Sequence, residues 1–299
     1  MATMSSGSTT GSGATAVALR RAVVAGAGTM GAGIAQVFAA SGRTVLLLEP
    51  SDAARAKGMA AIEKSLGRLV EKGTLPANAK EETLRRILKD EREFPLAECA
   101  IAVEAVPEKL DLKKSVLRDL DRKLPPSALL ATNTSSISIT ELAAATQRPA
   151  RVVGMHFMNP VPIMPLVEVV RGLETSPETV AETMELSRAL GKTPVTVEDR
   201  PGFVSNRVLM PMINEAAFAL MEGVATREAI DTVMKLGMNH PMGPLALADL
   251  IGVDVCLDIL EVLQKGFGDD KYRPCPLFRN LVAAGRLGRK SGRGFYEYP

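Results

Sequence analysis

The sequence predicts an α/β fold, in which a doubly wound and mostly parallel sheet is followed by an all-helical C-terminal region. Short β-branched segments alternate with amphipathic helical segments over residues 20–200, which is the pattern of βαβ units. A glycine-rich turn follows the first of these segments. Beyond Pro201 the predicted segments are all helical and are separated by Gly and Pro. A chain of 299 residues can hold two domains, and we place them at residues 20–200 and 201–299.

The individual elements follow from hydrophobic periodicity and from the Gly and Pro residues between them. In the first domain, strands are predicted at residues 21–25, 44–48, 100–104, 128–132, 151–157 and 166–171. Its predicted helices are one that ends near residue 41 and others at 52–72, 78–89, 111–123 and 139–146. In the second domain, helices are predicted at residues 204–221, 227–236, 249–263 and 276–284.

The composition excludes several classes of function. The net charge is +2, with 36 basic and 34 acidic residues mixed along the chain, and Trp is absent, so no nucleic-acid partner is expected. No membrane partner is expected either, because no apolar run approaches the roughly 18 residues of a transmembrane helix. Cys99, Cys256 and Cys275 are scattered and form no CxxC pair, which favours a reducing, cytoplasmic location and no metal site.

Residues 1–19 are rich in Ser, Thr, Gly and Ala and contain neither Lys nor Arg. This composition disfavours a secretory signal or an Arg-rich mitochondrial presequence. We interpret the segment as a flexible leader. The richness in Ser and Thr is also compatible with a plastid-type leader.

The glycine-rich turn indicates a dinucleotide site. It matches GxGxxG with the residues Gly26, Ala27, Gly28, Thr29, Met30 and Gly31. Such glycines allow a tight turn, close approach of the backbone to a pyrophosphate, and close packing of helix on strand. Gly-Ala runs also occur in ordinary helices, but here a strand precedes the motif and a helix follows it. The context therefore predicts a Rossmann-type nucleotide-binding domain.

Glu49 ends the second predicted strand, where such domains place an acidic residue against the ribose. A carboxylate accepts hydrogen bonds from both ribose hydroxyls and repels a 2′-phosphate, so NAD is predicted in preference to NADP. Two alternatives remain at this stage. Glu49 could be an ordinary solvated glutamate, and Arg43 is the nearest cation that could favour NADP.

Histidine is the side chain best suited to exchange a proton with an alcohol near neutral pH. The chain has two, His156 and His240. His156 ends a predicted strand at the carboxyl edge, where open α/β sheets bind ligands. If the chain then turns near Pro162, Glu168 faces His156 and can orient its ring. A polar pair without catalytic role is the alternative, and we interpret His240, in a Pro/Gly turn, as structural.

Two further segments carry polar candidates. Asn133 and Ser135 follow a predicted strand at the same carboxyl edge, where they could position a substrate oxygen or a nicotinamide amide. A helix cap supplied by Ser136 or Ser138 is the alternative for this segment. Asn206 lies early in the first helix of the second domain, where an exposed asparagine is the default interpretation.

These segments together resemble the 3-hydroxyacyl-CoA dehydrogenase family, especially its short-chain, 3-hydroxybutyryl-CoA members. The resemblance runs from about Arg20 to the C-terminus. It is carried by the blocks GAGTMGAGIAQVFAASG, VEAVPE, ATNTSSISI, GMHFMNPVPIMPLVEVV, PGFVSNRVLMPMINEA, MNHPMGP and GRKSGRGFYEY. It implies an NAD-dependent oxidoreductase of fatty acid metabolism that interconverts 3-hydroxyacyl-CoA and 3-oxoacyl-CoA by hydride transfer.

The resemblance also implies roles for individual residues. The family's catalytic positions correspond to Ser135, His156, Glu168 and Asn206. Positions on the cofactor side correspond to Glu108, Lys113, Asn159 and Lys290. Ser65 and Lys72 align with residues that contact coenzyme A.

Two positions depart from the family pattern. Glu49 replaces the more common aspartate, which keeps the charge but lengthens the reach, and Pro165 stands where many members carry lysine. Family members usually form homodimers through the helical domain, and the apolar segment 208–221 is consistent with a homodimer. The alternatives to this assignment are a β-hydroxyacid dehydrogenase or imine reductase, and a dinucleotide-binding sensor without turnover.

Overall fold

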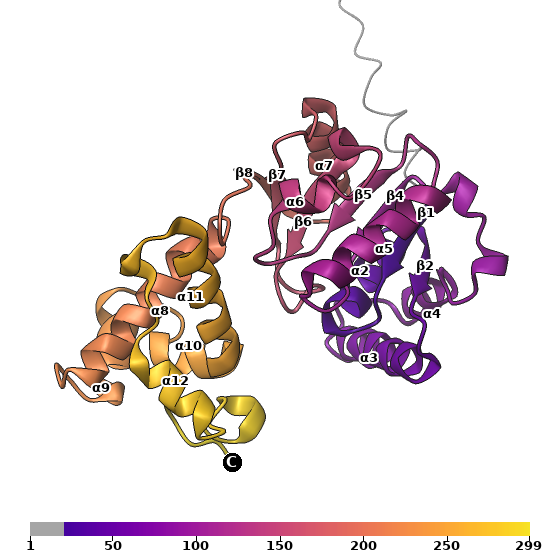
Figure 1. The fold of residues 1–299 in the computed structure, drawn as a ribbon. Coiled ribbons are helices and arrows are strands. Elements are labelled where there is room, and N and C mark those ends of the chain that lie inside the picture. Colours follow the sequence, from indigo (N-terminus) through magenta and orange to yellow (C-terminus); the bar gives the residue numbers. More distant parts are fainter. Residues whose placement is uncertain (1–20) are drawn as a thin grey trace, which may run out of the picture. The chain divides into compact units, whose positions relative to one another are not determined.

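The computed structural model describes residues 21–299, so the leader predicted at residues 1–19 lies outside the described part of the chain. The chain divides into two compact units, the first ending at Asp199 and the second beginning at Arg200. Figure 1 shows the sheet of the first unit and the helices of the second.

The first unit contains, within the described residues, an eight-stranded sheet in the order β3-β2-β1-β4-β5-β6-β7-β8. Its strands are β1 Arg21–Ala25, β2 Thr44–Leu48, β3 Ile87–Leu88, β4 Ile101–Glu104, β5 Leu129–Thr132, β6 Val152–Phe157, β7 Leu166–Arg171 and β8 Thr193–Glu198. Neighbouring strands are parallel except at the β6–β7 pair, which is antiparallel. The predicted doubly wound, mostly parallel sheet is therefore confirmed.

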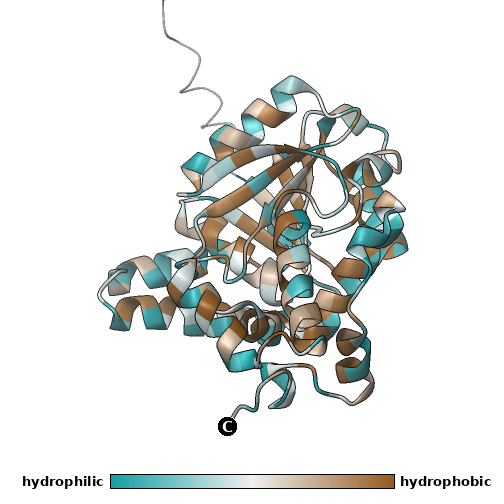
Figure 2. Ribbon diagram, turned by 90° about the vertical axis from the view of Figure 1, so that its left-hand side faces the viewer, coloured by the Kyte–Doolittle hydropathy of each residue, from teal (hydrophilic) through white to brown (hydrophobic). Residues whose placement is uncertain are grey.

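Helices cover both faces of this sheet. The helices of the first unit are α2 Thr29–Ala40, α3 Asp52–Glu71, α4 Ala77–Arg85, α5 Leu110–Lys123, α6 Ile139–Ala143 and α7 Pro177–Ala189. Alternate strand residues, such as Val24, Val103 and Met155, form one apolar core with side chains of α2, α3 and α7. The intervening strand residues point to the opposite face, where α5 contacts β4 and β5 and α6 contacts β6. Figure 2 shows the strands largely in the colour of apolar residues.

The second unit is helical, as predicted. Its helices are α8 Ser205–Met221, α9 Arg227–Thr232, α10 Pro244–Ile251, α11 Val253–Phe267 and α12 Pro276–Ala283. They enclose a separate apolar core that includes Ile213, Leu245, Leu260 and Phe278.

Several predicted elements were wrong in detail. The helix predicted at 78–89 ends at Arg85, and the two-residue strand β3 follows it, too short to show a period. The helix predicted at 249–263 is two helices, because Gly252 adopts φ +112° between α10 and α11. Helix α7 and strand β8 were not predicted. The start of helix α7 can be predicted from the sequence, because Ser176 accepts the Thr179 N–H and proline follows the cap. Strand β8 is harder to predict, because it is an edge strand with a mostly exposed, polar pattern.

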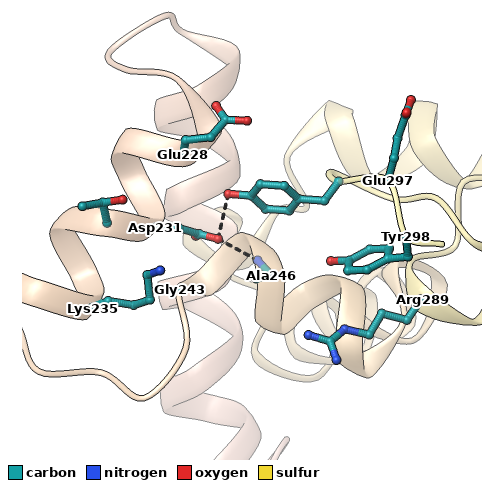
Figure 3. Close-up of a pocket in the computed structure, with 10 residues that line it drawn as sticks. Glu228, Asp231, Lys235, Gly243, Ala246, Arg289, Glu297 and Tyr298 are labelled. Carbon is teal, nitrogen blue, oxygen red and sulfur yellow. Dashed lines mark hydrogen bonds between the residues drawn. The ribbon is translucent and has the colours of Figure 1, made fainter.

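Two buried aspartates hold the second unit together. Asp231 accepts the N–H groups of Leu245 and Ala246 at the start of α10 and the hydroxyl of Tyr296, beside a cavity of about 430 Å³ (Figure 3). Asp249 accepts the N–H groups of Phe295 and Tyr296, both at 2.8 Å, and the hydroxyl of Tyr298 at 3.0 Å.

Burial and the bond to Asp249 raise the pKa of Tyr298 to about 12, so its hydroxyl stays a donor at neutral pH. These aspartates therefore fasten the C-terminal segment to α9 and α10.

We predict that Asp249→Ala destabilises the second unit by about 3 kcal/mol or more, because each buried donor left without an acceptor costs about 1–3 kcal/mol. Tyr298→Phe removes one of the three bonds and should cost about 1 kcal/mol. The chain has three tyrosines and no tryptophan, and all three tyrosines lie in the second unit. Tyrosine fluorescence during urea unfolding therefore reports this unit selectively. Equal urea midpoints for Asp249→Ala and the unmodified chain would contradict the stabilising role given to Asp249.

Candidate active site

The glycine turn between β1 and α2 has two glycines that the surrounding backbone requires. Gly26 has φ +105°, and a Cβ there would lie 2.7 Å from the Ala105 carbonyl oxygen. A Cβ on Gly31 would lie 1.9 Å from the Gly26 carbonyl oxygen. Gly28 differs, since a Cβ there would meet no described atom within 4 Å apart from Gly28 itself and its neighbours in the chain. The open space beside Gly28 is what close approach of a pyrophosphate requires.

The start of α2 fits an anionic ligand. Thr29 and Met30 form its first turn, which contains no acidic residue, and no described side chain caps it. The first N–H groups of a helix lack partners within the helix, so they and the positive end of the helix dipole favour a phosphate. The cradle beside Gly28 and this helix start together fit a dinucleotide.

Glu49 is held in place at the end of β2. Its carboxylate accepts the N–H groups of Ala27 and Ser51, each at 3.1 Å. Arg55 donates to the Glu49 carbonyl oxygen at 2.7 Å and pairs with Asp52. The sequence analysis did not single out Arg55. The only local indication was its position one turn into α3, the helix that follows β2. The cation considered earlier, Arg43, is buried and donates to Ser41 Oγ at 2.7 Å.

His156 and Glu168 face each other across the β6–β7 pair, which confirms the predicted hairpin register. His156 Nδ1 lies 2.8 Å from Glu168 Oε2, and both side chains are buried. A carboxylate only accepts hydrogen bonds, so it holds the proton on Nδ1 and makes Nε2 an acceptor. Ser135 Oγ lies 3.1 Å from that Nε2. Three side chains thus form one hydrogen-bonded chain from Ser135 through His156 to Glu168.

The segment that carries Ser135 is anchored by its neighbours. Asn133 is buried, and its Oδ1 accepts the Phe157 N–H at 2.9 Å, which joins the end of β5 to the end of β6. Ser138 caps α6 by accepting the Glu141 N–H. The helix-cap role considered for this segment therefore falls on Ser138 and leaves the Ser135 hydroxyl beside the histidine.

Glu108 and Lys113, both proposed for the cofactor side, lie in a network with a residue that sequence reasoning missed. Lys113 is buried and its Nζ lies 2.9 Å from Glu104 Oε1 and 3.2 Å from Glu108 Oε2. Burial raises the pKa of Glu108, but the charge of Lys113 and hydrogen bonds from Thr134 and Ser135 outweigh it and leave the pKa below its ordinary value. Glu108 is therefore a carboxylate near neutral pH.

The remaining candidates are distributed over the two units. Asn159 is exposed, in the loop that links β6 to β7. Ser65 is half-buried and lies in α3, and Lys72 is exposed and caps the C-terminal end of the same helix, seven positions later. Asn206 lies in the first turn of α8 in the second unit. In the same unit, Lys290 Nζ is paired with the Asp254 carboxylate at 2.5 Å.

No group of three or more His, Cys, Asp or Glu side chains in residues 21–299 could hold a metal ion. No helix within the same residues is both long enough and apolar enough to cross a membrane.

Comparison with known proteins agrees with this geometry. Residues 21–200 match the NAD binding domain of 3-hydroxyacyl-CoA dehydrogenase, and residues 202–298 match the C-terminal domain of the same family. A probable 3-hydroxybutyryl-CoA dehydrogenase of Bacillus subtilis is 54% identical over 94% of this chain and 98% of its own length. A 3-hydroxybutyryl-CoA dehydrogenase of Bradyrhizobium diazoefficiens is 50% identical over 95% of this chain and 97% of its own length.

A solved structure is similar over almost the same span. The crystal structure of (S)-3-hydroxybutyryl-CoA dehydrogenase from Ralstonia eutropha has a TM-score of 0.90 and 51% identity, covering 94% of this chain and 99% of that chain. The glycine turn and the matched NAD-binding domain define the class as an NAD-dependent oxidoreductase. The chain belongs to the 3-hydroxyacyl-CoA dehydrogenase family, so the predicted resemblance and cofactor are confirmed.

The different surroundings of two glycines lead to a prediction. Gly28→Ala should fold with an unchanged melting temperature but weaken NADH binding by about tenfold or more, equivalent to at least about 1.4 kcal/mol. Gly31→Ala should lower both stability and binding, because its Cβ would overlap the Gly26 carbonyl oxygen. Thermal unfolding and titration of NADH fluorescence separate the two effects. Unchanged NADH affinity in Gly28→Ala would refute the placement of the pyrophosphate.

Proposed function

We propose that this protein is a short-chain 3-hydroxyacyl-CoA dehydrogenase, which uses NAD to interconvert (S)-3-hydroxybutyryl-CoA and acetoacetyl-CoA. The observation that carries the proposal is the hydrogen-bonded chain of Ser135, His156 and Glu168 at the carboxyl edge of the NAD-binding sheet. The substrate and its stereochemistry are supported by the names of the relatives. We place the reaction in fatty acid metabolism, as the family resemblance implies.

The chain's own residues supply proton transfer and orientation. Bound NAD would supply the acceptor for a hydride from C3 of the substrate. Nε2 of His156 accepts the proton of the C3 hydroxyl as the hydride leaves, and Glu168 stabilises the imidazolium through Nδ1–H. In the reverse direction the same imidazolium returns the proton to the 3-oxo group.

Ser135 would hold the reacting oxygen. Its hydroxyl lies within hydrogen-bond distance of Nε2, so an oxygen bound by Ser135 is also close to the nitrogen that exchanges the proton. We assign a second contact with substrate oxygens to Asn206, from the family position that it occupies. Asn159 and Lys290 remain proposed cofactor-side residues on the same basis. Asn133 is proposed for the cofactor side because it follows β5 at the carboxyl edge of the sheet.

Coenzyme A would lie along α3. Ser65 offers a hydroxyl, and Lys72 at the C-terminal end of the helix offers an exposed ammonium for the phosphates. Because exposed charge pairs contribute about 1 kcal/mol or less, Lys72→Gln should raise KM for the thioester by a factor of a few. A fall in kcat at unchanged KM would reject this placement.

We also propose a homodimer formed through the helical unit. Val208 and Met221 of α8 and Val224 after it are exposed apolar side chains, as expected of a surface that a second copy covers. Light scattering should give the mass of a dimer. All three cysteines are buried and free, which supports a reducing, cytoplasmic location.

The direct test is the oxidation of NADH in the presence of acetoacetyl-CoA, longer 3-oxoacyl-CoAs and free acetoacetate. We expect turnover with the thioesters, fastest with acetoacetyl-CoA. Turnover with the free acid alone would favour a β-hydroxyacid dehydrogenase, and NADH binding without any turnover would favour a sensor.

We predict that His156→Gln lowers kcat by about 10² to 10⁴, the usual contribution of general acid–base catalysis, and leaves the Kd for NADH unchanged. Glu168→Gln should also lower kcat, because the ring loses the group that orients it. The two losses should be non-additive, since the residues act as one unit. Steady-state kinetics of both single variants and the double variant test this. If the two losses in kcat simply multiply in the double variant, His156 and Glu168 do not act as one unit.

Cofactor preference tests Glu49. NADH should exceed NADPH by at least about tenfold in kcat/KM, because a like charge placed against the 2′-phosphate costs about 1 kcal/mol or more. Glu49→Ala should narrow this preference and weaken NADH binding. Equal efficiency of the unmodified enzyme with the two cofactors would show that Glu49 does not select NAD.

A further inference from the structure

Glu108 contacts the Ser135 segment more extensively than a residue that serves only the cofactor would need to. A single oxygen of its carboxylate, Oε1, accepts four hydrogen bonds. The donors are Thr134 Oγ1 at 2.5 Å, the Ser135 N–H at 2.9 Å, and the N–H and Oγ of Ser136, both at 3.1 Å. The backbone of Ser135 is therefore bonded directly to Glu108.

The other oxygen of the carboxylate fixes Glu108 in turn. Glu108 Oε2 lies 3.2 Å from Lys113 Nζ, and the same Nζ donates to the Val106 carbonyl oxygen at 3.1 Å. Lys113 Nζ also contacts both oxygens of Glu104, at 2.9 and 3.1 Å. Lys113 is therefore a buried cation bridging two carboxylates.

Glu104 is itself fully engaged. It is completely buried at the end of β4, and its carboxylate accepts the Val106 N–H and the Thr132 hydroxyl, both at 2.6 Å. A buried charge is tolerated only when it is paired and hydrogen-bonded. Glu104 and Lys113 pair with each other, and hydrogen bonds with Val106 and Thr132 complete their coordination. The network thus spans the end of β4, the start of α5 and the end of β5.

This network meets the catalytic chain at Ser135. On one side Glu108 holds the Ser135 backbone, and on the other the Ser135 hydroxyl lies beside His156. A displacement of about 1 Å in a reacting geometry can cost about 10² in rate. The orientation of Ser135 therefore depends on where Glu108 holds its peptide group.

We propose that Glu108 is a positioning residue for Ser135, and that Lys113 and Glu104 act by fixing the carboxylate of Glu108. This inference rests on the proposed function, because it assumes that Ser135 contacts the substrate. It assigns Glu108 a role through Ser135 in addition to its expected place beside the cofactor, and it gives Glu104 a role that no family position suggested.

The test is a double-mutant cycle between Glu108 and Ser135, with acetoacetyl-CoA and NADH as substrates. Glu108→Ala should lower kcat by about tenfold or more, with a change of less than about threefold in the Kd for NADH. Glu108→Gln keeps an acceptor oxygen for the segment and should recover part of the loss. In the Ser135→Ala background, Glu108→Ala should lower kcat further by less than about twofold, because the group that it positions is gone.

A matched control lies one residue along the same helix. Lys114 pairs with Glu141 at 2.7 Å near the surface and is outside the network. Lys114→Met should leave kcat and the Kd for NADH unchanged. Lys113→Met leaves the buried Glu104 carboxylate without its cation, so it risks unfolding, and the proposal is therefore tested on Glu108.

Hydrogen exchange provides a readout that does not depend on activity. In the unmodified protein the amides of Ser135 and Ser136 should be protected by Glu108, and Glu108→Ala should accelerate their exchange while Lys114→Met does not. Unchanged exchange would overturn the proposal. Equal losses of kcat in both Ser135 backgrounds would overturn it as well, as would a rise in the Kd for NADH that accounts for the whole loss of kcat/KM.

Failure of the proposed function looks different. If the unmodified protein does not turn over any 3-oxoacyl-CoA, the substrate assignment fails, whatever the exchange experiment shows. If turnover is normal but Ser135→Ala has no effect on kcat, the substrate assignment stands and the positioning role is overturned.

Discussion

The strands that carry the site run parallel, and this one constraint places most of the active site. Because these strands are parallel, the carboxyl ends of β1, β2, β4, β5 and β6 lie at a single edge of the sheet. The glycine turn, Glu49, Glu104, the Ser135 segment and His156 each follow or end one of these strands. Residues far apart in the chain therefore meet without any long loop. The exception is β7, whose antiparallel return brings Glu168 opposite His156.

Side-chain alternation decides which of these groups can interact. In β4, β5 and β6 the residues before Glu104, Thr132 and His156 belong to the apolar core shared with α2 and α3. Glu104, Thr132 and His156 therefore point to the opposite face, where α5 supplies Lys113. A shift of one residue in any of these strands would move its polar group into the apolar core, so the hydrophobic pattern that folds the sheet also aims its polar side chains.

Buried carboxylates in both units are paired with cations or with hydrogen-bond donors. Each buried carboxylate of the first unit's site is matched by a cation or by an N–H or hydroxyl donor, as Glu104 is by Lys113 and Glu168 by His156. In the second unit Asp231 and Asp249 accept backbone N–H groups and tyrosine hydroxyls. Such groups are costly to break one at a time, so they favour one arrangement of the chain over others. In the first unit this rigidity is at the site, and in the second it fastens the C-terminal segment.

The sequence by itself determined the fold class, most strands, the cofactor motif and the pairing of His156 with Glu168. Each of these features depends on residues that are close together in the sequence. They are GxGxxG between a strand and a helix, an acidic residue ending the next strand, and a histidine and a glutamate at equal distances from a Pro-rich turn. Motif resemblance added Ser135 and Glu108. The sequence was silent on β3, which is too short to show a period, and on the break at Gly252.

Only the tertiary structure decided how the polar residues are connected. Glu104 looks like the last residue of an apolar strand, and nothing near it in the chain identifies its partners. Lys113 lies nine positions away and Thr132 on another strand. That Glu108 holds the Ser135 peptide also appears only when the two loops after β4 and β5 are folded side by side. The local sequence pattern predicts which residues are buried and where the chain turns. A hydrogen-bond network between loops depends on strand order and register, because these bring together residues that no sequence periodicity relates.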